Sequence, residues 1–253
     1  MKLFHLIFIL LVSLTSFKVS SQIMIGETTE SKKSDARKQK KENLASNQEL
    51  DGSTEIYFSS SWSESYRKLV ENGSLYGLPL YKRADEKNLS TWSYSVGFRN
   101  FVSKKILFEG GISYMKNGES YQYKDSDSSF NYQTTYSYIG MPVKAYYFLG
   151  KDIRFFVGGG LIPQMFVKYR QEQQWENKVN TKSTATITST NEFNSFVMSA
   201  AANVGIQLKY SKFWSIYVMP EYRWQLNTSL SKTADYKHYA RVFSVGGGVV
   251  YRF

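Results

Sequence analysis

The chain contains no cysteine, and only two of its 253 residues are histidine. Without cysteine it can form no disulfide, no thiolate metal site and no lipid anchor on an N-terminal cysteine. His5 lies in the first apolar segment and His238 lies near the C-terminus. A calcium loop beginning at Asp125 would need glycine where Phe130 stands and glutamate where Tyr136 stands. The sequence therefore predicts no metal site and no cofactor.

Long apolar runs are also missing beyond the N-terminus, so no later segment predicts a membrane-spanning helix, which needs ~20 apolar residues. Residues 1–22 combine a basic start, a short apolar run and small residues before Gln22, which predicts a secretory signal peptide. An N-terminal membrane anchor is the alternative, but the run is short for one. Residues 23–52 carry mixed charge and no aromatic residue, which predicts a flexible charged periplasmic tail.

Aromatic residues are abundant instead, with 20 tyrosines, 17 phenylalanines and 5 tryptophans. At the C-terminus, Phe243 and Tyr251 alternate with small or polar residues such as Ser244 and Arg252. A strand with this alternation suits lipid on one face and a polar lumen on the other. Because only helices and closed barrels cross a bilayer, we expect residues 53–253 to form a closed barrel.

Eight segments are predicted to be strands: 55–63, 91–102, 106–116, 132–149, 153–170, 193–210, 213–226 and 241–253. Short connections at 103–105, 150–152 and 211–212 alternate with long polar ones at 64–90, 117–131, 171–192 and 227–238. Bacterial outer-membrane barrels have short periplasmic turns and longer external loops. The sequence therefore predicts an all-β fold, an eight-stranded antiparallel transmembrane β-barrel in the outer membrane with both termini in the periplasm.

Alternation along the strands also predicts which charged residues enter the lumen. The predicted lumen charge network is Arg99, Glu109, Lys144, Lys168, Glu221, Arg223 and Arg252. An eight-stranded barrel is just wide enough for side chains to fill it, and an unpaired buried charge is costly. We therefore expect a filled polar lumen of paired charges, with a small-solute channel as the alternative.

The opposite faces of the strands predict an aromatic girdle at each edge of the membrane. Trp214 and Trp224 share a face ten residues apart, which at ~3.3 Å per residue and a tilt near 45° gives roughly 23 Å along the membrane normal. That matches an apolar band of about 25 Å. The predicted girdle residues are Trp92, Trp214, Trp224, Tyr251 and Phe253.

Glycine and proline occur inside several predicted strands. Gly158-Gly-Gly160 and Gly246-Gly-Gly248 lack the lysine and hydroxyl residue of a phosphate loop, and we expect them to relieve crowding near bulky lumen side chains. Pro142, Pro163 and Pro220 each remove a backbone donor, which predicts local bulges.

Catalytic residues are not predicted. His238, with Asp235 and a nearby serine, could resemble the hydrolytic constellation of outer-membrane lipid A deacylases. The favoured interpretation is a solvated loop histidine, because no usable serine at the lipid boundary is evident. We therefore expect a protein that is not an enzyme, with a lipid A-modifying barrel hydrolase as the alternative.

Basic residues near the external rim are predicted to meet lipopolysaccharide phosphates. They are Lys116, Lys124, Lys168, Arg170, Lys178, Lys182, Lys232, Lys237 and Arg241. They are dispersed among apolar residues and form no nucleic-acid groove, so the expected partners are outer-membrane lipid and lipopolysaccharide. A soluble secreted barrel that binds an apolar ligand is a further alternative, against which the inward charges argue.

Several segments resemble the outer-membrane barrel family common in Bacteroidetes, often labelled PorT-like. They are Tyr138-Ile-Gly-Met-Pro-Val-Lys-Ala-Tyr-Tyr-Phe148, Phe155-Phe-Val-Gly-Gly-Gly-Leu161, Met219-Pro-Glu-Tyr-Arg-Trp-Gln-Leu226 and the closing Tyr-Arg-Phe253. The resemblance implies an eight-stranded barrel without general catalytic residues. It also implies an envelope-structural or interaction role, including accessory service in protein secretion, and recognition of the C-terminal strand by the barrel-assembly machinery.

Overall fold

A computed structural model describes residues 53–71, 86–124, 126, 128–177, 182–190, 193–231 and 236–253 of the chain. The predicted signal peptide (1–22) and tail (23–52) lie outside the described residues. So do Asp125, Asp235, Lys178, Lys232 and the side chain of Lys182.

The described residues form one antiparallel sheet of ten strands. In chain order these are β1 (Thr54–Glu71), β2 (Glu86–Phe101), β3 (Ile106–Lys124), β4 (Ser128–Gly140), β5 (Val143–Gly150), β6 (Ile153–Asn177), β7 (Lys182–Ser189), β8 (Phe196–Lys209), β9 (Trp214–Gln225) and β10 (Tyr236–Arg252). No helix in the described part of the chain is both long and apolar enough to cross a bilayer.

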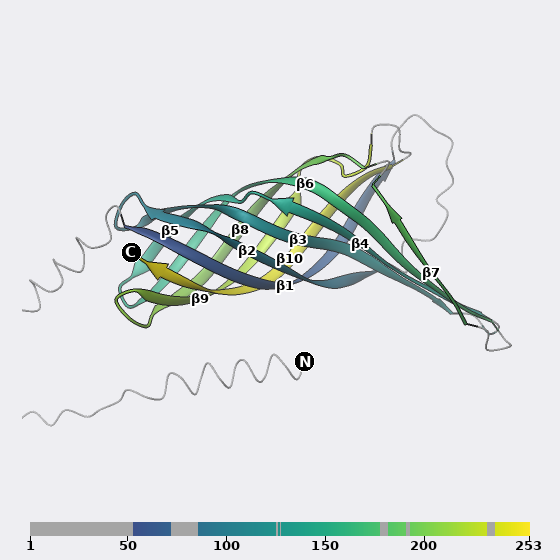
Figure 1. Ribbon diagram of the computed structural model, residues 1–253, viewed down its shortest axis with the longest axis horizontal. Coiled ribbons are helices and arrows are strands. Elements are labelled where there is room, and N and C mark those ends of the chain that lie inside the picture. Colours follow the sequence, from purple (N-terminus) through teal and green to yellow (C-terminus); the bar gives the residue numbers. More distant parts are fainter. Residues whose placement is uncertain are drawn as a thin grey trace, which may run out of the picture. The chain divides into compact units, whose positions relative to one another are not determined.

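The sheet closes into a barrel because β1 pairs with both β2 and β10 (Figure 1). β4 and β5 together make one stave: both pair with β3 and with β6, and the chain breaks between them at Met141 and Pro142. β7 pairs only with β6 among the named strands and stands outside the ring. The ring therefore has eight staves, as predicted.

Several strands continue well beyond the predicted ends. The predicted loop 117–131 is mostly a hairpin of β3 and β4, and β6 and β7 form a second hairpin where the loop 171–192 was predicted. β1 and β10 also pair as far as Glu71 and Tyr236. The prediction of long loops was wrong here because tyrosine, threonine and glutamine sustain ladder pairing although they are polar.

The two faces of the barrel wall differ in polarity. The outer face carries large exposed apolar side chains, which on β6 run from Phe155 (56% exposed) to Val167 (41% exposed). We call this belt the apolar band. Its polar counterpart lies inside, where serine, asparagine, glutamine and charged side chains are buried. The barrel is thus apolar outside and polar inside, the reverse of a water-soluble protein.

Strand glycines make room for aromatic rings inside the barrel, as predicted. A Cβ on Gly158 would lie 2.4 Å from the Tyr146 ring, and one on Gly248 would lie 2.8 Å from the Tyr217 ring. Of the strand prolines, Pro142 ends the β4 pairing, whereas Pro163 and Pro220 keep their neighbours in register. The predicted bulges are therefore absent at these last two positions.

Candidate functional site

The lumen is filled by layers of paired charges and aromatic rings. In one layer, Arg99 Nε donates to Glu109 Oε2 at 2.7 Å. The Arg99 guanidinium lies 4.7 Å from the ring centroid of Tyr57 and 4.3 Å from that of Tyr217. Tyr146 Oη also donates to Glu109, at 3.1 Å. This layer satisfies both charges and leaves aromatic rings across the barrel axis.

A second ion pair lies next to this layer, and a third closes the barrel. Lys144 Nζ donates to Glu221 Oε2 at 2.5 Å, and both side chains are less than a tenth exposed. Arg252 pairs with Glu55 at 2.5 Å, joining the first strand to the last. Arg223 completes the set, with Nη2 donating to Asn117 Oδ1 at 3.1 Å.

Six of the seven predicted lumen charges are therefore buried inside, but Lys168 is exposed on the outer face. The prediction was wrong for Lys168 because the β4–β6 register shifts there: Tyr138 pairs with Phe166, and Ser137 pairs with Lys168. The additional residue, Val167, forms a β-bulge that reverses the alternation of the strand beyond it.

The five predicted girdle residues all lie on the outer face. Trp92, Trp214 and Phe253 are 54%, 49% and 67% exposed, and Trp224 and Tyr251 are partly exposed. Tyr251 packs against Trp214 with ring centroids 4.9 Å apart. The outer face therefore has aromatic rings at both edges of the apolar band.

Small side chains leave a cavity of about 50 Å³ in the middle of the lumen. Serines from β1, β2, β3 and β10 line it, facing the Lys144–Glu221 pair. The Arg99 layer bounds it on one side and Arg223 on the other. A cavity of this volume holds a few water molecules, not a continuous aqueous path.

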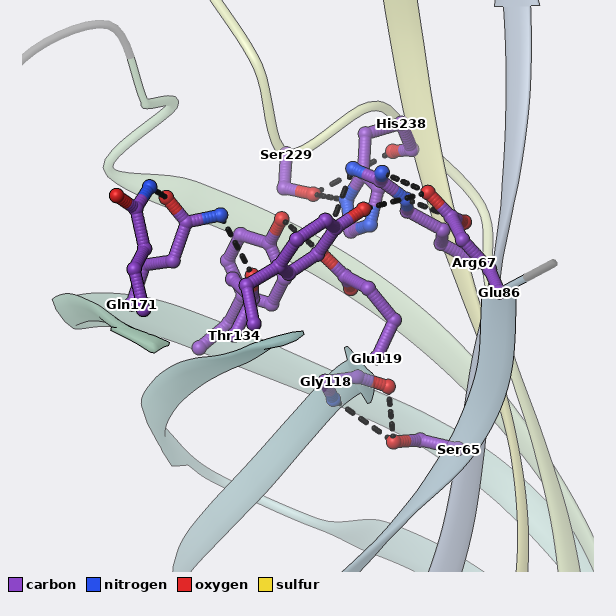
Figure 2. A network of polar contacts seen from close by, with 12 residues as sticks. Ser65, Arg67, Glu86, Gly118, Glu119, Thr134, Gln171, Ser229 and His238 are labelled. Atoms are coloured by element: carbon purple, nitrogen blue, oxygen red, sulfur yellow. Dashed lines mark hydrogen bonds and ion pairs between the residues drawn. The ribbon is translucent and has the colours of Figure 1, made fainter. Parts of the chain in front are cut away.

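A second polar cluster lies in the external mouth of the barrel, beyond the apolar band (Figure 2). Arg67 binds two carboxylates: Nε donates to Glu86 Oε2 at 3.0 Å, and Nη1 lies 3.3 Å from Glu119 Oε1. Tyr132 and Tyr136 donate to Glu86 and Glu119, each at 3.1 Å. We call these residues, with His238 and Ser229, the mouth cluster.

His238 lies at the centre of the mouth cluster and is only 2% exposed, so the prediction of a solvated loop histidine was wrong. Its ring centroid lies 4.8 Å from that of Tyr136, and its Nδ1 is hydrogen-bonded to Ser229 Oγ. Nε2 has no hydrogen-bond partner among the described residues. The error arose because β10 starts at Tyr236, within the predicted loop.

Burial sets the ionisation of this cluster. It raises the pKa of Glu119 to about 7, although the Arg67 guanidinium opposes the shift. Burial also lowers the pKa of His238 to about 3, and Arg67 adds to that shift. Burial lowers the pKa of Arg67 too, but its contacts with Glu86 and Glu119 raise it overall. His238 is therefore neutral near neutral pH, while Glu119 titrates there.

A Ser–His pair can in principle activate a hydroxyl nucleophile, but this pair lacks what hydrolysis needs. Ser229 is fully buried, so a substrate has no access to its hydroxyl in this conformation. Its partner nitrogen is Nδ1, and no described carboxylate orients the imidazole through Nε2. Within the described residues, no group of three acidic or histidine side chains is arranged to hold a metal ion.

Sequence reasoning missed Arg67, Glu86 and Glu119 because all three lay in predicted loops. The signal that could have found Arg67 is the continuing alternation of Ser63, Ser65 and Arg67, all on the lumen side of β1. Ser65 is bonded to the backbone of Gly118 in both directions, at 2.7 and 2.8 Å.

No protein-family model matches the chain, and no curated relative does. Three solved structures are similar. Neisserial surface protein A is 12% identical over 78% of this chain and 97% of its own, with a TM-score of 0.40. OprG of Pseudomonas aeruginosa is 11% identical over 81% and 97%, with a TM-score of 0.42. Ail of Yersinia pestis is 14% identical over 81% and 100%, with a TM-score of 0.34. These values are too low to carry a function to this chain.

Proposed function

We propose that this chain is an integral outer-membrane β-barrel without enzymatic activity, which anchors an external β-sheet as an interaction surface. The observation that carries the proposal is the reversal of polarity across the barrel wall. Large apolar side chains are exposed outside, from Phe155 to Val167 on β6, while ion pairs such as Lys144–Glu221 are buried inside. Water would penalise that outer face, whereas lipid solvates it.

The external sheet supplies the interaction surface. The outer parts of β3, β4 and β6, together with β7, extend beyond the ring (Figure 1). One face carries an aromatic ladder, in which Tyr121 stacks on Tyr132 at 5.1 Å and Phe130 stacks on Trp175 at 5.1 Å. Trp175 and Tyr123 are 41% and 46% exposed. Exposed aromatic side chains in one patch are typical of binding surfaces.

A filled lumen and a buried Ser–His pair favour this role over the alternatives. A small-solute channel would need a path past the Arg99 layer, and a lipid A hydrolase would need an accessible Ser229. Outer-membrane lipid, lipopolysaccharide and the barrel-assembly machinery are the partners we propose, the last through β10. Kinship with the PorT-like barrels, and accessory service in secretion, belong to the same proposal.

Membrane location is tested by fractionating cells that express the full chain. We expect the protein in the outer-membrane fraction, and its unboiled detergent extract should migrate faster than the boiled one because closed barrels resist unfolding in detergent. Recovery from the soluble periplasmic fraction would contradict the proposal.

The interaction surface is tested with a photo-crosslinking amino acid placed at Trp175 in intact cells. The matched control is the same amino acid at Thr184, which is exposed on the other face of the same hairpin. We expect a discrete crosslinked product from position 175 and none from 184. Equal crosslinking from both positions, or none from either, would remove the aromatic face from the proposal.

A further inference from the structure

A groove of about 330 Å³ crosses β3, β4 and β6 on the outer face of the barrel. Ser137 forms its floor and is paired with Lys116 on one side and Lys168 on the other. Thr135 and Arg170 form the next row outward. Two basic side chains thus flank a hydroxyl group, and we call this feature the Lys116–Lys168 groove.

The β-bulge at Val167 creates this groove. Phe166 packs against Tyr138 inside the barrel, with ring centroids 5.6 Å apart, whereas Val167 and Lys168 are both exposed outside. Without the additional residue, strict alternation would turn Lys168 into the lumen. Bulges often redirect a side chain to a functional position, and this one adds a second cation beside Lys116.

The two lysines are available to an anion. Among the ion pairs between described residues, none includes Lys116 or Lys168, whereas Arg170 is bound to Glu172 at 2.6 Å. Lys116 Nζ lies 5.6 Å from the ring centroid of Tyr114. Neighbouring strands lie ~4.8 Å apart, so the lysine backbones are roughly 10 Å apart and their long side chains can converge on one anion.

The position of the groove indicates what carries that anion. Directly below it, towards the middle of the barrel, Ile139, Met165 and Val167 are 45%, 59% and 41% exposed. An anion held by Lys116 and Lys168 would therefore lie at the boundary between a polar and an apolar surface. A lipid, with a charged head group and apolar chains, matches both surfaces together.

We propose that the Lys116–Lys168 groove binds a phosphate monoester on the saccharide head group of an outer-leaflet lipid of the lipid A class. The acyl chains lie along Ile139 and Met165. This inference rests on the proposed membrane location. A phosphate monoester carries nearly two negative charges and three acceptor oxygens, which suits two lysines and the hydroxyls of Ser137 and Thr135. The phosphodiester of a glycerophospholipid carries one charge and matches the pair less well.

The test is native mass spectrometry of the full chain, purified in a non-ionic detergent and titrated with bis-phosphorylated lipid A. The site variant is K116Q/K168Q. The control variant is K87Q/K124Q, which removes the same charge from two exposed lysines of the external sheet away from the groove. Dephosphorylated lipid A and phosphatidylglycerol are titrated in parallel.

Each cation near a membrane surface contributes about fivefold in affinity, so the site variant should bind bis-phosphorylated lipid A about thirtyfold more weakly. The control variant should change binding less than twofold, and dephosphorylated lipid A should bind wild type as weakly as the site variant binds the phosphorylated lipid. Equal losses in both variants, or equal binding of phosphatidylglycerol, would overturn the assignment. Heat-modifiable migration of every variant shows that the barrel itself is intact, which separates this failure from failure of the proposed membrane location.

Discussion

Replacement of Lys144 or Glu221 tests whether ion pairs hold the lumen together. Both side chains are less than a tenth exposed, and Nζ donates to Oε2 at 2.5 Å. Removing one partner from a buried pair costs about 3–5 kcal/mol, because the other charge stays buried without its counterion. K144M should fall at the lower end, because Asn203 still donates to Glu221 at 3.3 Å. E221M should fall at the upper end, because the neighbouring carboxylate, Glu109, is already bound to Arg99 at 2.7 Å.

The double variant K144M/E221M removes both charges and keeps similar side-chain volume, so it should cost much less than the two single changes added together. We expect a coupling free energy of at least about 3 kcal/mol from urea titrations in phosphocholine vesicles, followed by tryptophan fluorescence. R170Q is the matched control, because the Arg170–Glu172 pair is about half exposed and should contribute about 0–1 kcal/mol. Additive effects of K144M and E221M, or single costs no larger than that of R170Q, would refute the reasoning.

Three further predictions concern the mouth cluster and the strand glycines. Because burial raises the pKa of Glu119 from 4.5 to about 7, the folded chain holds more protons than the unfolded chain between these values. Its contribution to the free energy of unfolding is therefore present below pH 4.5 and is lost as pH rises to 7, by about 3 kcal/mol at most, and E119Q should remove this slope from urea titrations. H238A should cost about 2–4 kcal/mol in the same titrations, because it leaves a cavity beside Tyr136 and an unpaired Ser229, yet leave the mass spectrum of cellular lipid A unchanged; a new lipid A species in the variant would instead support the hydrolase. G248A should cost about 1–3 kcal/mol, because its Cβ would lie 2.8 Å from the Tyr217 ring, whereas G247A, whose Cβ would meet no atom closer than 3.4 Å, should be nearly neutral; equal costs would contradict the packing argument.

The alternation of polar and apolar residues predicted the ring of strands because a barrel wall repeats one simple pattern. It failed where a local event interrupts that pattern. Nothing in the sequence around Val167 announces a bulge, so alternation placed Lys168 in the lumen although it lies outside. Asn117-Gly118 is a common turn sequence, but here Gly118 lies in a ladder against Ser65.

The mouth cluster could not be predicted for a different reason. Arg67, Glu86 and Glu119 belong to three strands, and their contacts depend on the registers of all three. The Glu55–Arg252 pair likewise joins residues 197 positions apart. Composition indicates that buried charges need partners, but the choice of partner is set by strand register. Register in turn depends on hairpin lengths that the polar external sequence leaves open.

Single-cysteine labelling tests the central claim, that the apolar outer face contacts lipid and the external sheet faces the cell exterior. The chain has no cysteine, so each introduced thiol is unique. The positions are Ser183 in β7, Lys104 in the turn between β2 and β3, and Leu161 in the apolar band, which is 48% exposed in the isolated barrel. With a membrane-impermeant maleimide, we expect S183C to react on intact cells, K104C to react only after the outer membrane is permeabilised, and L161C to react only after denaturation. Reaction of L161C in the folded protein, or of K104C on intact cells, would contradict the account.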